Sequence, residues 1–117
     1  MKLRAAEGVP LADIIGLQRL RDERFFVGWD EFVSPERVAV SEGSVRRLID
    51  DLIALGPAQS EDAARAAVDE CVRRFNALDD EGWICTIERE DIYEHIGRAI
   101  DLCGFEYDEE WVGERDW

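Results

Sequence analysis

The sequence predicts an all-α fold, a compact bundle of about four helices that forms a single domain over residues 1–117. The first observation is that four segments carry apolar residues at the i, i+3, i+4, i+7 spacing of one helical face. The second is that short breaks containing glycine or proline separate these segments. The third is that 46% hydrophobic and 36% charged residues in 117 positions match one ordinary globular domain. Packing helix on helix is the simplest way to bury four such faces.

Start and stop signals place the first two helices. Pro10 and the apolar residues of 11–20 predict the first helix, because proline is well tolerated in a first turn. The polar stretch 41–44 is expected to cap the second helix, whose apolar face lies in 45–55. Gly56-Pro57 then ends that helix.

The third and fourth helices have similar signals. Ser60 is expected to cap the third helix, whose apolar face extends over 64–78 and which Gly82 closes. Thr86 is expected to cap the fourth helix, and Gly104 to stop it.

Residues 24–33 lie between the first two helices and are dense in aromatic side chains. Aromatic and β-branched residues favour extended structure, so we expect a buried extended segment or a loop laid on the core. Residues 83–87 carry the same signal. A short two-stranded sheet of 24–33 and 83–87 is therefore the main alternative within the bundle, with Ser34-Pro35 marking the end of the first segment.

The net charge narrows the class of partner. Acidic residues number 28 and basic residues 14, which leaves a formal charge of -14. Such a field repels nucleic acid and anionic membrane surfaces and attracts a basic protein. We therefore expect a basic protein partner, no nucleic acid and no membrane, while solubility alone is the competing explanation of the acidity.

The cysteines and glycines indicate no cofactor. Cys71, Cys85 and Cys103 are odd in number and form no CxxC pair, so neither a disulfide framework nor a zinc site is indicated. No glycine pattern of a nucleotide-binding loop is present. The first residues resemble no signal peptide and no run reaches the length of a membrane span, so a cytoplasmic protein is expected.

The only histidine, His95, lies near several carboxylates. Asp91, Glu94 and His95 allow the hypothesis of a small metal-dependent enzyme, although the spacing differs from that of di-iron bundles. The alternative is a surface pair between Asp91 and His95 on one helix, at i, i+4 spacing. That pair is the commoner arrangement and favours a non-enzymatic protein.

The segment 106–117 is the most unusual part of the chain, with six acidic residues, one arginine and three aromatic rings. Rings among carboxylates can anchor in a partner's pocket while the charges select a basic partner. The predicted partner-binding residues are Tyr107, Asp108, Glu109, Glu110, Trp111, Glu114, Asp116 and Trp117. The competing interpretation is that Trp111 and Trp117 fold back to close the core.

Five short segments also carry a resemblance from about residue 38 onward: Val40-Ser41-Glu42-Gly43, Arg74-Phe75-Asn76-Ala77-Leu78, Glu88-Arg89-Glu90-Asp91-Ile92, Gly104-Phe105 and Arg115-Asp116-Trp117. On these segments the chain resembles a family of small acidic bacterial proteins known as a domain of unknown function. The resemblance extends over about two thirds of the chain. It implies a helical bacterial cytoplasmic domain and brings no catalytic residues with it.

These observations together favour a non-enzymatic protein-binding module. We expect an inhibitor or immunity-type protein that neutralises a basic partner, such as a toxin that acts on nucleic acid. The alternatives are the metal-dependent enzyme and a homodimeric accessory protein that pairs through residues 25–33. Both a monomer and a homodimer are compatible with the sequence.

Overall fold

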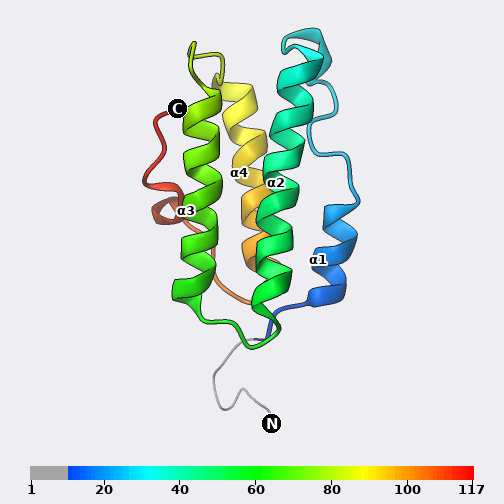
Figure 1. Ribbon diagram of the computed structural model, residues 1–117, viewed down its shortest axis with the longest axis vertical. Helices are drawn as coiled ribbons and strands as arrows, with labels where there is room; N and C mark the ends of the chain where they lie inside the picture. The colour runs from blue at the N-terminus through cyan, green and yellow to red at the C-terminus, as the bar shows by residue number, and fades with distance from the viewer. Residues whose placement is uncertain (1–10) are drawn as a thin grey trace.

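Four α-helices run alternately up and down along one axis in the computed structural model, which describes residues 11–117 (Figure 1). The elements are α1 (Ile14–Arg21), η1 (Trp29–Glu31), α2 (Pro35–Leu55), α3 (Glu61–Leu78), α4 (Thr86–Leu102) and η2 (Glu109–Val112), where η marks a 3-10 helix. No strand occurs in the described range. The predicted all-α bundle of about four helices is therefore confirmed.

Side-chain hydrogen bonds cap the first turns of α1 and α3. Asp13 accepts a hydrogen bond from the N–H of Gly16 at 2.8 Å, so α1 begins at Ile14, and Pro10 lies outside the described residues. Ser60 accepts from the N–H of Ala63 at 3.1 Å and caps α3, as predicted.

The predicted start of the second helix is wrong by about two turns. Ser34 caps α2 by accepting from the N–H of Arg37 at 3.2 Å, and Pro35 is its first residue. Ser41 and Ser44 lie buried inside the helix. The pair Ser34-Pro35 is thus a helix start, because proline at the first position needs no hydrogen-bond acceptor.

The predicted cap of the fourth helix is also wrong, by one residue. Cys85 occupies the cap position and Thr86 is the first residue of α4. The backbone N–H of Cys85 donates to Oε1 of Glu88 at 2.8 Å, so the buried carboxylate of Glu88 satisfies an N–H at the helix start.

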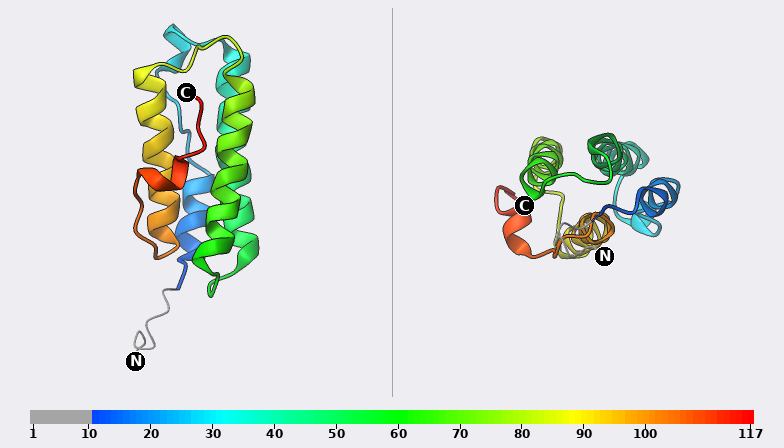
Figure 2. Two further views of the ribbon diagram at one scale, coloured as in Figure 1. Left: turned by 90° about the vertical axis from the view of Figure 1, so that its left-hand side faces the viewer. Right: turned by 90° about the horizontal axis from the view of Figure 1, so that it is seen from below.

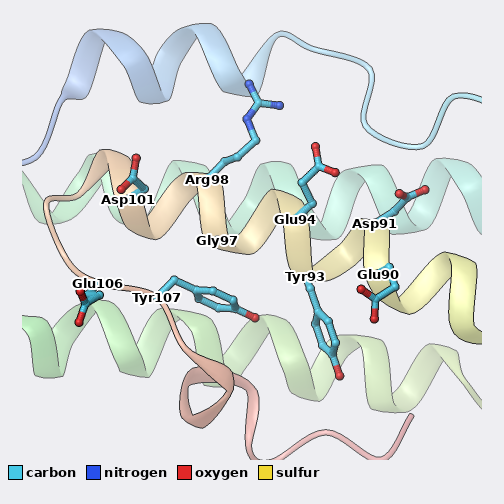
Figure 3. A pocket seen from close by; sticks show the side chains of 9 residues that line it. All are labelled: Glu90, Asp91, Tyr93, Glu94, Gly97, Arg98, Asp101, Glu106 and Tyr107. Atoms are coloured by element: carbon cyan, nitrogen blue, oxygen red, sulfur yellow. The ribbon is translucent and has the colours of Figure 1, made fainter.

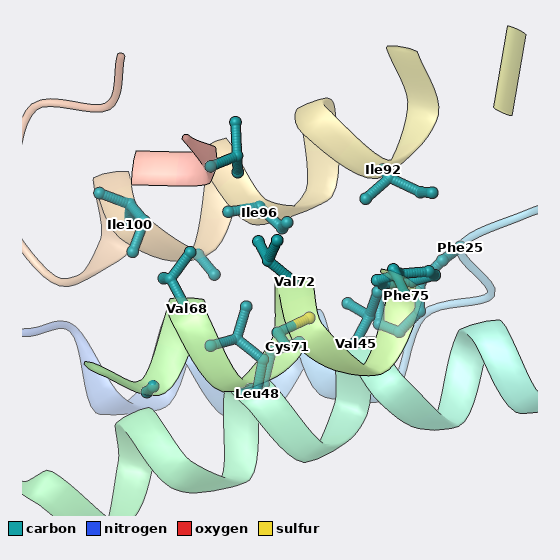
Figure 4. Packing of buried hydrophobic residues seen from close by; sticks show 14 of the residues in the cluster. Phe25, Val45, Leu48, Val68, Cys71, Val72, Phe75, Ile92, Ile96 and Ile100 are labelled. Carbon is teal, nitrogen blue, oxygen red and sulfur yellow. The ribbon is translucent and has the colours of Figure 1, made fainter. Parts of the chain in front are cut away.

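The apolar faces of α2, α3 and α4 meet in a shared core (Figure 4). Leu48 of α2, Val72 and Phe75 of α3, and Ile92 and Ile96 of α4 are fully buried there. The core forms because each helix turns its apolar face inward and its charged face toward water.

The three cysteines fall into two classes. Cys71 and Cys103 are buried, as their positions on apolar faces predict, and burial raises the pKa of each thiol to about 11. Cys85 is exposed. Thiolate chemistry at neutral pH is therefore disfavoured at Cys71 and Cys103.

A glycine allows α1 and α4 to approach closely. A Cβ atom on Gly16 would lie 2.8 Å from Cδ2 of Leu102, which is shorter than real contacts allow. The N–H of Asp13 donates to the carbonyl oxygen of Leu102 at 2.7 Å in the same place. A side chain at residue 16 would therefore meet both the capping carboxylate of Asp13, at 2.6 Å, and the side chain of Leu102.

Side chains from two helices bond the aromatic segment 24–33. Glu42 of α2 accepts from the backbone N–H of Phe25 and from Nε of Arg24, each at 3.1 Å. Nε2 of His95 on α4 bonds the carbonyl oxygen of Phe25 at 2.9 Å. Because a carbonyl oxygen only accepts, Nε2 is the protonated ring nitrogen. Both backbone polar groups of Phe25 are therefore satisfied without a strand.

Trp29 attaches the far end of the same segment to α4. Its Nε1 donates to Oδ2 of Asp91 at 2.9 Å, and its ring stacks on Phe26 with centroids 4.0 Å apart. The predicted alternative of a two-stranded sheet from 24–33 and 83–87 is wrong, because the first segment bonds to helix side chains instead. The prediction of a loop laid on the core is confirmed.

None of the helices in residues 11–117 combines the length and the hydrophobicity that crossing a bilayer would require.

Replacing Glu42 with glutamine tests the attachment of residue 25 to α2. Burial opposes ionisation of Glu42, but hydrogen bonds from Arg24 and from the N–H groups of Phe26 and Phe25 outweigh it and hold its pKa below the usual value. The ionised carboxylate therefore stabilises the fold fully above about pH 5, and this contribution is lost as pH falls through the folded-state pKa.

We expect Glu42→Gln to lower the free energy of unfolding at pH 7 by about 1.5–3 kcal/mol, measured by urea denaturation. The difference from the unsubstituted protein should shrink toward pH 3. Glu36→Gln, at an exposed position of the same helix, is the control and should change little. An equal difference at both pH values would contradict the role of the charge.

Candidate functional site

The C-terminal segment 105–117 covers the seam between α3 and α4 (Figure 2). Trp111 is 1% exposed, and its Nε1 donates to the carbonyl oxygen of Glu106 at 3.0 Å. The guanidinium of Arg65 on α3 lies 4.1 Å from the centroid of the Trp111 ring. This ring is therefore enclosed by α3 and by its own segment.

The end of the chain is attached to the same seam. Trp117 is 8% exposed and packs against Phe75 of α3 and Tyr93 of α4, with ring centroids 5.9 and 5.8 Å apart. Asn76 of α3 donates to the carbonyl oxygen of Glu114 at 3.0 Å and accepts from the N–H of residue 116 at 2.8 Å. One side-chain amide thus binds the backbone of the segment twice.

The interpretation that Trp111 and Trp117 fold back to close the core is confirmed. Their rings contribute to the bundle's own stability and are not presented to a partner. Of the other predicted partner-binding residues, Asp108, Glu109, Glu110, Glu114 and Asp116 are exposed, and Tyr107 is half-buried. Asp108 also caps η2 by accepting from the N–H of Glu110 at 2.9 Å.

An acidic groove of about 720 Å³ runs along the outer face of α4, beside the start of the C-terminal segment. Figure 3 shows Tyr93 and Tyr107 on the side of α4 toward the C-terminal segment, and Arg98 and Asp101 on the side toward α1. The groove is lined by Glu90, Asp91, Tyr93, Glu94, Gly97, Arg98, Asp101, Glu106 and Tyr107. Five carboxylates and one guanidinium therefore surround one hollow.

The guanidinium of the groove is already paired. Arg98 donates to both carboxylate oxygens of Glu23, at 3.0 and 2.9 Å. Its hydrogen bond lowers the pKa of Glu23, so that carboxylate is ionised at neutral pH. Arg98 is the only basic residue in the lining of the groove, and it is paired with Glu23. The five carboxylates of the lining therefore have no basic partner within the groove.

Tyr107 forms one wall of the groove. Its Cδ2 lies 3.2 Å from where a Cβ of residue 97 would stand, so the ring fits because residue 97 is glycine. Burial, with smaller contributions from Tyr93 and Glu109, raises the pKa of Tyr107 to about 12, and the phenol is neutral at physiological pH. Its hydroxyl oxygen is buried and has no hydrogen-bond partner within residues 11–117.

Sequence reasoning identified Tyr107 but missed Glu90, Asp101 and Glu106 as parts of one site. The acidic face of α4 could have been predicted, because acidic residues at 90, 94 and 101 share one face of a helix at i, i+4 and i+11. That Glu106 lies close to this face could not have been predicted, because its position depends on how the chain turns back after Gly104.

The predicted helix-surface pair between Asp91 and His95 is wrong. His95 is buried and bonds Phe25, Asp91 accepts from Trp29, and Glu94 is exposed in the groove. Asp91 and Glu94 both line the groove, but His95 is buried away from them. Within the described chain, no three histidine, cysteine or carboxylate side chains are placed to share a metal ion.

The negative charge is concentrated toward the carboxyl end. Residues 88–117 hold eleven acidic and three basic side chains, a net charge of -8 out of the -14 of the whole chain. These residues form α4 and the segment packed beside it. The acidic groove therefore lies in the most negative part of the molecule.

Replacing Trp111 with alanine distinguishes a core ring from a partner-binding ring. Because the ring is enclosed, we expect Trp111→Ala to lower the free energy of unfolding by about 3–5 kcal/mol, measured by urea denaturation. Phe32→Ser is the control, since Phe32 is 77% exposed and its loss should change stability by about 0.5 kcal/mol or less. An unchanged midpoint for Trp111→Ala would show that the ring is not part of the core.

Comparison of the chain with protein-family models, curated proteins and solved structures finds no match.

Proposed function

We propose that this protein is a non-enzymatic binding module that recognises a basic partner protein through the acidic groove of α4 and the C-terminal segment. The observation that supports the proposal most is the groove itself, which places five carboxylates around one hollow. Lysine and arginine side chains are the natural protein ligands of such a lining, because carboxylates accept their hydrogen bonds and oppose their charge.

The size and the aromatic walls of the groove support the same ligand. The groove is an open stretch of surface, and its volume of about 720 Å³ leaves room for several side chains of a partner. Tyr107 supplies ring surface, on which the stem of a lysine or the plane of an arginine can pack, whereas the Tyr93 ring already contacts Arg115 and Trp117 of the same chain.

The charge distribution outside the groove favours rapid association with a basic partner. Seven arginines in the described chain are ion-paired with carboxylates of the same molecule. The excess carboxylates dominate the outer field, and such a field raises the association rate of an oppositely charged protein.

An inhibitor or immunity-type role is the form of binding that we infer. A row of carboxylates along a helix offers the charge pattern that a nucleic-acid-binding protein meets on a phosphate backbone. A basic toxin that acts on nucleic acid would be neutralised if this surface occupied its phosphate-binding site.

Charge removal in the groove tests the proposal. The variant Glu90→Gln/Glu94→Gln/Asp101→Asn should weaken binding of a lysine- and arginine-rich helical peptide by about tenfold or more at low salt. The loss follows from three fewer opposite charges, and fluorescence anisotropy measures the Kd. Binding by the unsubstituted protein should also weaken as salt is raised.

The control variant removes the same charge elsewhere. Glu36→Gln/Asp62→Asn/Glu70→Gln changes three exposed carboxylates of α2 and α3, none of which lines the groove. It should change the Kd by about threefold or less, since only the long-range field is reduced. Equal weakening by both variants would mean that the peptide responds to net charge alone, and the groove would lose its role.

A further inference from the structure

A second, apolar groove lies at the end of the bundle where α4 begins. It has a volume of about 380 Å³ and is lined by Phe32, Val33, Trp83, Cys85, Thr86, Ile87 and Glu88. Phe32 is 77% and Ile87 64% exposed, so two large apolar side chains face water beside one hollow. Scattered exposed apolar residues are ordinary, but a hollow between two of them is typical of a contact surface.

The apolar groove and the acidic groove follow one another along α4. Ile87 and Glu90 are three residues apart, and Glu94 and Asp101 follow on the same outer face of the helix. From Ile87 to Asp101 the helix rises by about 21 Å. One partner segment of that length would therefore contact both grooves.

Exposed acidic residues lie close in the chain to residues that line the apolar groove. Glu31 precedes Phe32 in the chain, Glu81 lies two residues before Trp83, and all three of Glu31, Glu81 and Glu90 are exposed. Arg37 packs its guanidinium 5.3 Å from the Trp83 ring and is ion-paired with Glu81 at 2.7 Å. Because Glu81 is already paired with Arg37, Glu31 and Glu90 are the carboxylates that would attract a lysine or arginine beside an apolar side chain in this groove.

We infer that the apolar groove is the anchor site of the docking surface, and that its ligand is a basic segment of a partner protein carrying one large apolar side chain. This inference rests on the proposed function. The apolar side chain inserts beside Phe32 and Ile87, while lysines or arginines of the same segment lie along Glu90, Glu94 and Asp101.

The charged and the apolar contacts of such an interface contribute differently to binding. Exposed charge pairs speed association and select the partner, but each contributes little to affinity in water. Affinity comes mainly from a few large side chains that are buried in pockets. Because Trp111 and Trp117 are buried in the core, the anchoring contact that such an interface needs falls to the exposed apolar residues.

A second copy of this chain fits the groove less well than a basic segment does. Each copy carries a net charge of -14, and carboxylates stand around the groove on both copies. Self-association through this end would bring like charges together.

The test uses two peptides of about 20 residues, long enough to form a helix. Both consist of alanine and lysine with lysines on one face, and one of them carries a single leucine near its end. We expect the leucine peptide to bind the full chain about 10- to 100-fold more tightly than the peptide with alanine at that position, measured by fluorescence anisotropy.

The double variant Phe32→Ser/Ile87→Ser should abolish this difference without changing the salt dependence of binding. The matched control is Ile15→Ser. Ile15 is 63% exposed and is the second residue of α1, as Ile87 is the second residue of α4, but it lies at the opposite end of the bundle (Figure 1). The control should keep the preference for the leucine peptide.

The outcomes separate this inference from the proposed function. If both peptides bind equally, or if the double variant keeps the preference, the anchor site is overturned. The proposed function stands if the three-carboxylate groove variant still weakens binding, and fails if it does not.

If light scattering shows a dimer of the unsubstituted protein that the double variant converts to a monomer, the groove is a self-interface and the inference is overturned. Circular dichroism of both variants confirms folding, which exposed positions should not disturb.

Discussion

The packing of the C-terminal segment into the seam between α3 and α4 is the interaction on which the rest of the structure depends. Trp111, Val112 and Trp117 are buried there and cover apolar residues of both helices. Without these rings, the helices would expose part of their apolar faces to water. The same segment, through Glu106 and Tyr107, forms one wall of the acidic groove. The stability of the bundle and the shape of its candidate site therefore have one origin.

The carboxylates of this protein divide into an internal and an external set. Glu42 and Glu88 are buried and accept backbone N–H groups, and Asp91 accepts the indole N–H of Trp29. Such residues stabilise the fold because an ionised acceptor makes stronger hydrogen bonds than a neutral one. Six of the seven ion-paired arginines bond carboxylates of the external set, and only Arg24 bonds the buried Glu42. With 28 acidic and 14 basic residues, many external carboxylates still have no basic residue to pair with, and these produce the negative surface field.

The helices could be predicted from the sequence because their signals are local. Ser60 with Glu61 and Asp62, followed by the apolar spacing of 64–78, contains within one stretch all that defines α3. Ser34-Pro35 is equally local, yet the same pair is found both at helix starts and in loops. The hydrogen bond from the N–H of Arg37 to Ser34 shows that α2 begins there, and Ser41 and Ser44 are buried within that helix.

The contacts of the candidate site could be predicted only in part, because they join residues far apart in the chain. The aromatic density of 24–33 correctly indicated burial, but its partners Glu42 and His95 lie on two different helices. Likewise, a tryptophan at position 111 or 117 is compatible with both a core and an interface. The choice depends on whether Arg65, Phe75 and Asn76 are placed to receive it, which is a property of the packed bundle.

The contrast between the three cysteines has a practical consequence for studying the apolar groove. Cys85 lines that groove and is exposed, whereas the thiols of Cys71 and Cys103 are buried and stay protonated at neutral pH. A maleimide dye should therefore label the native chain at one position, with no engineered residue. That dye would report, through its emission, when a ligand displaces water from the end of the bundle.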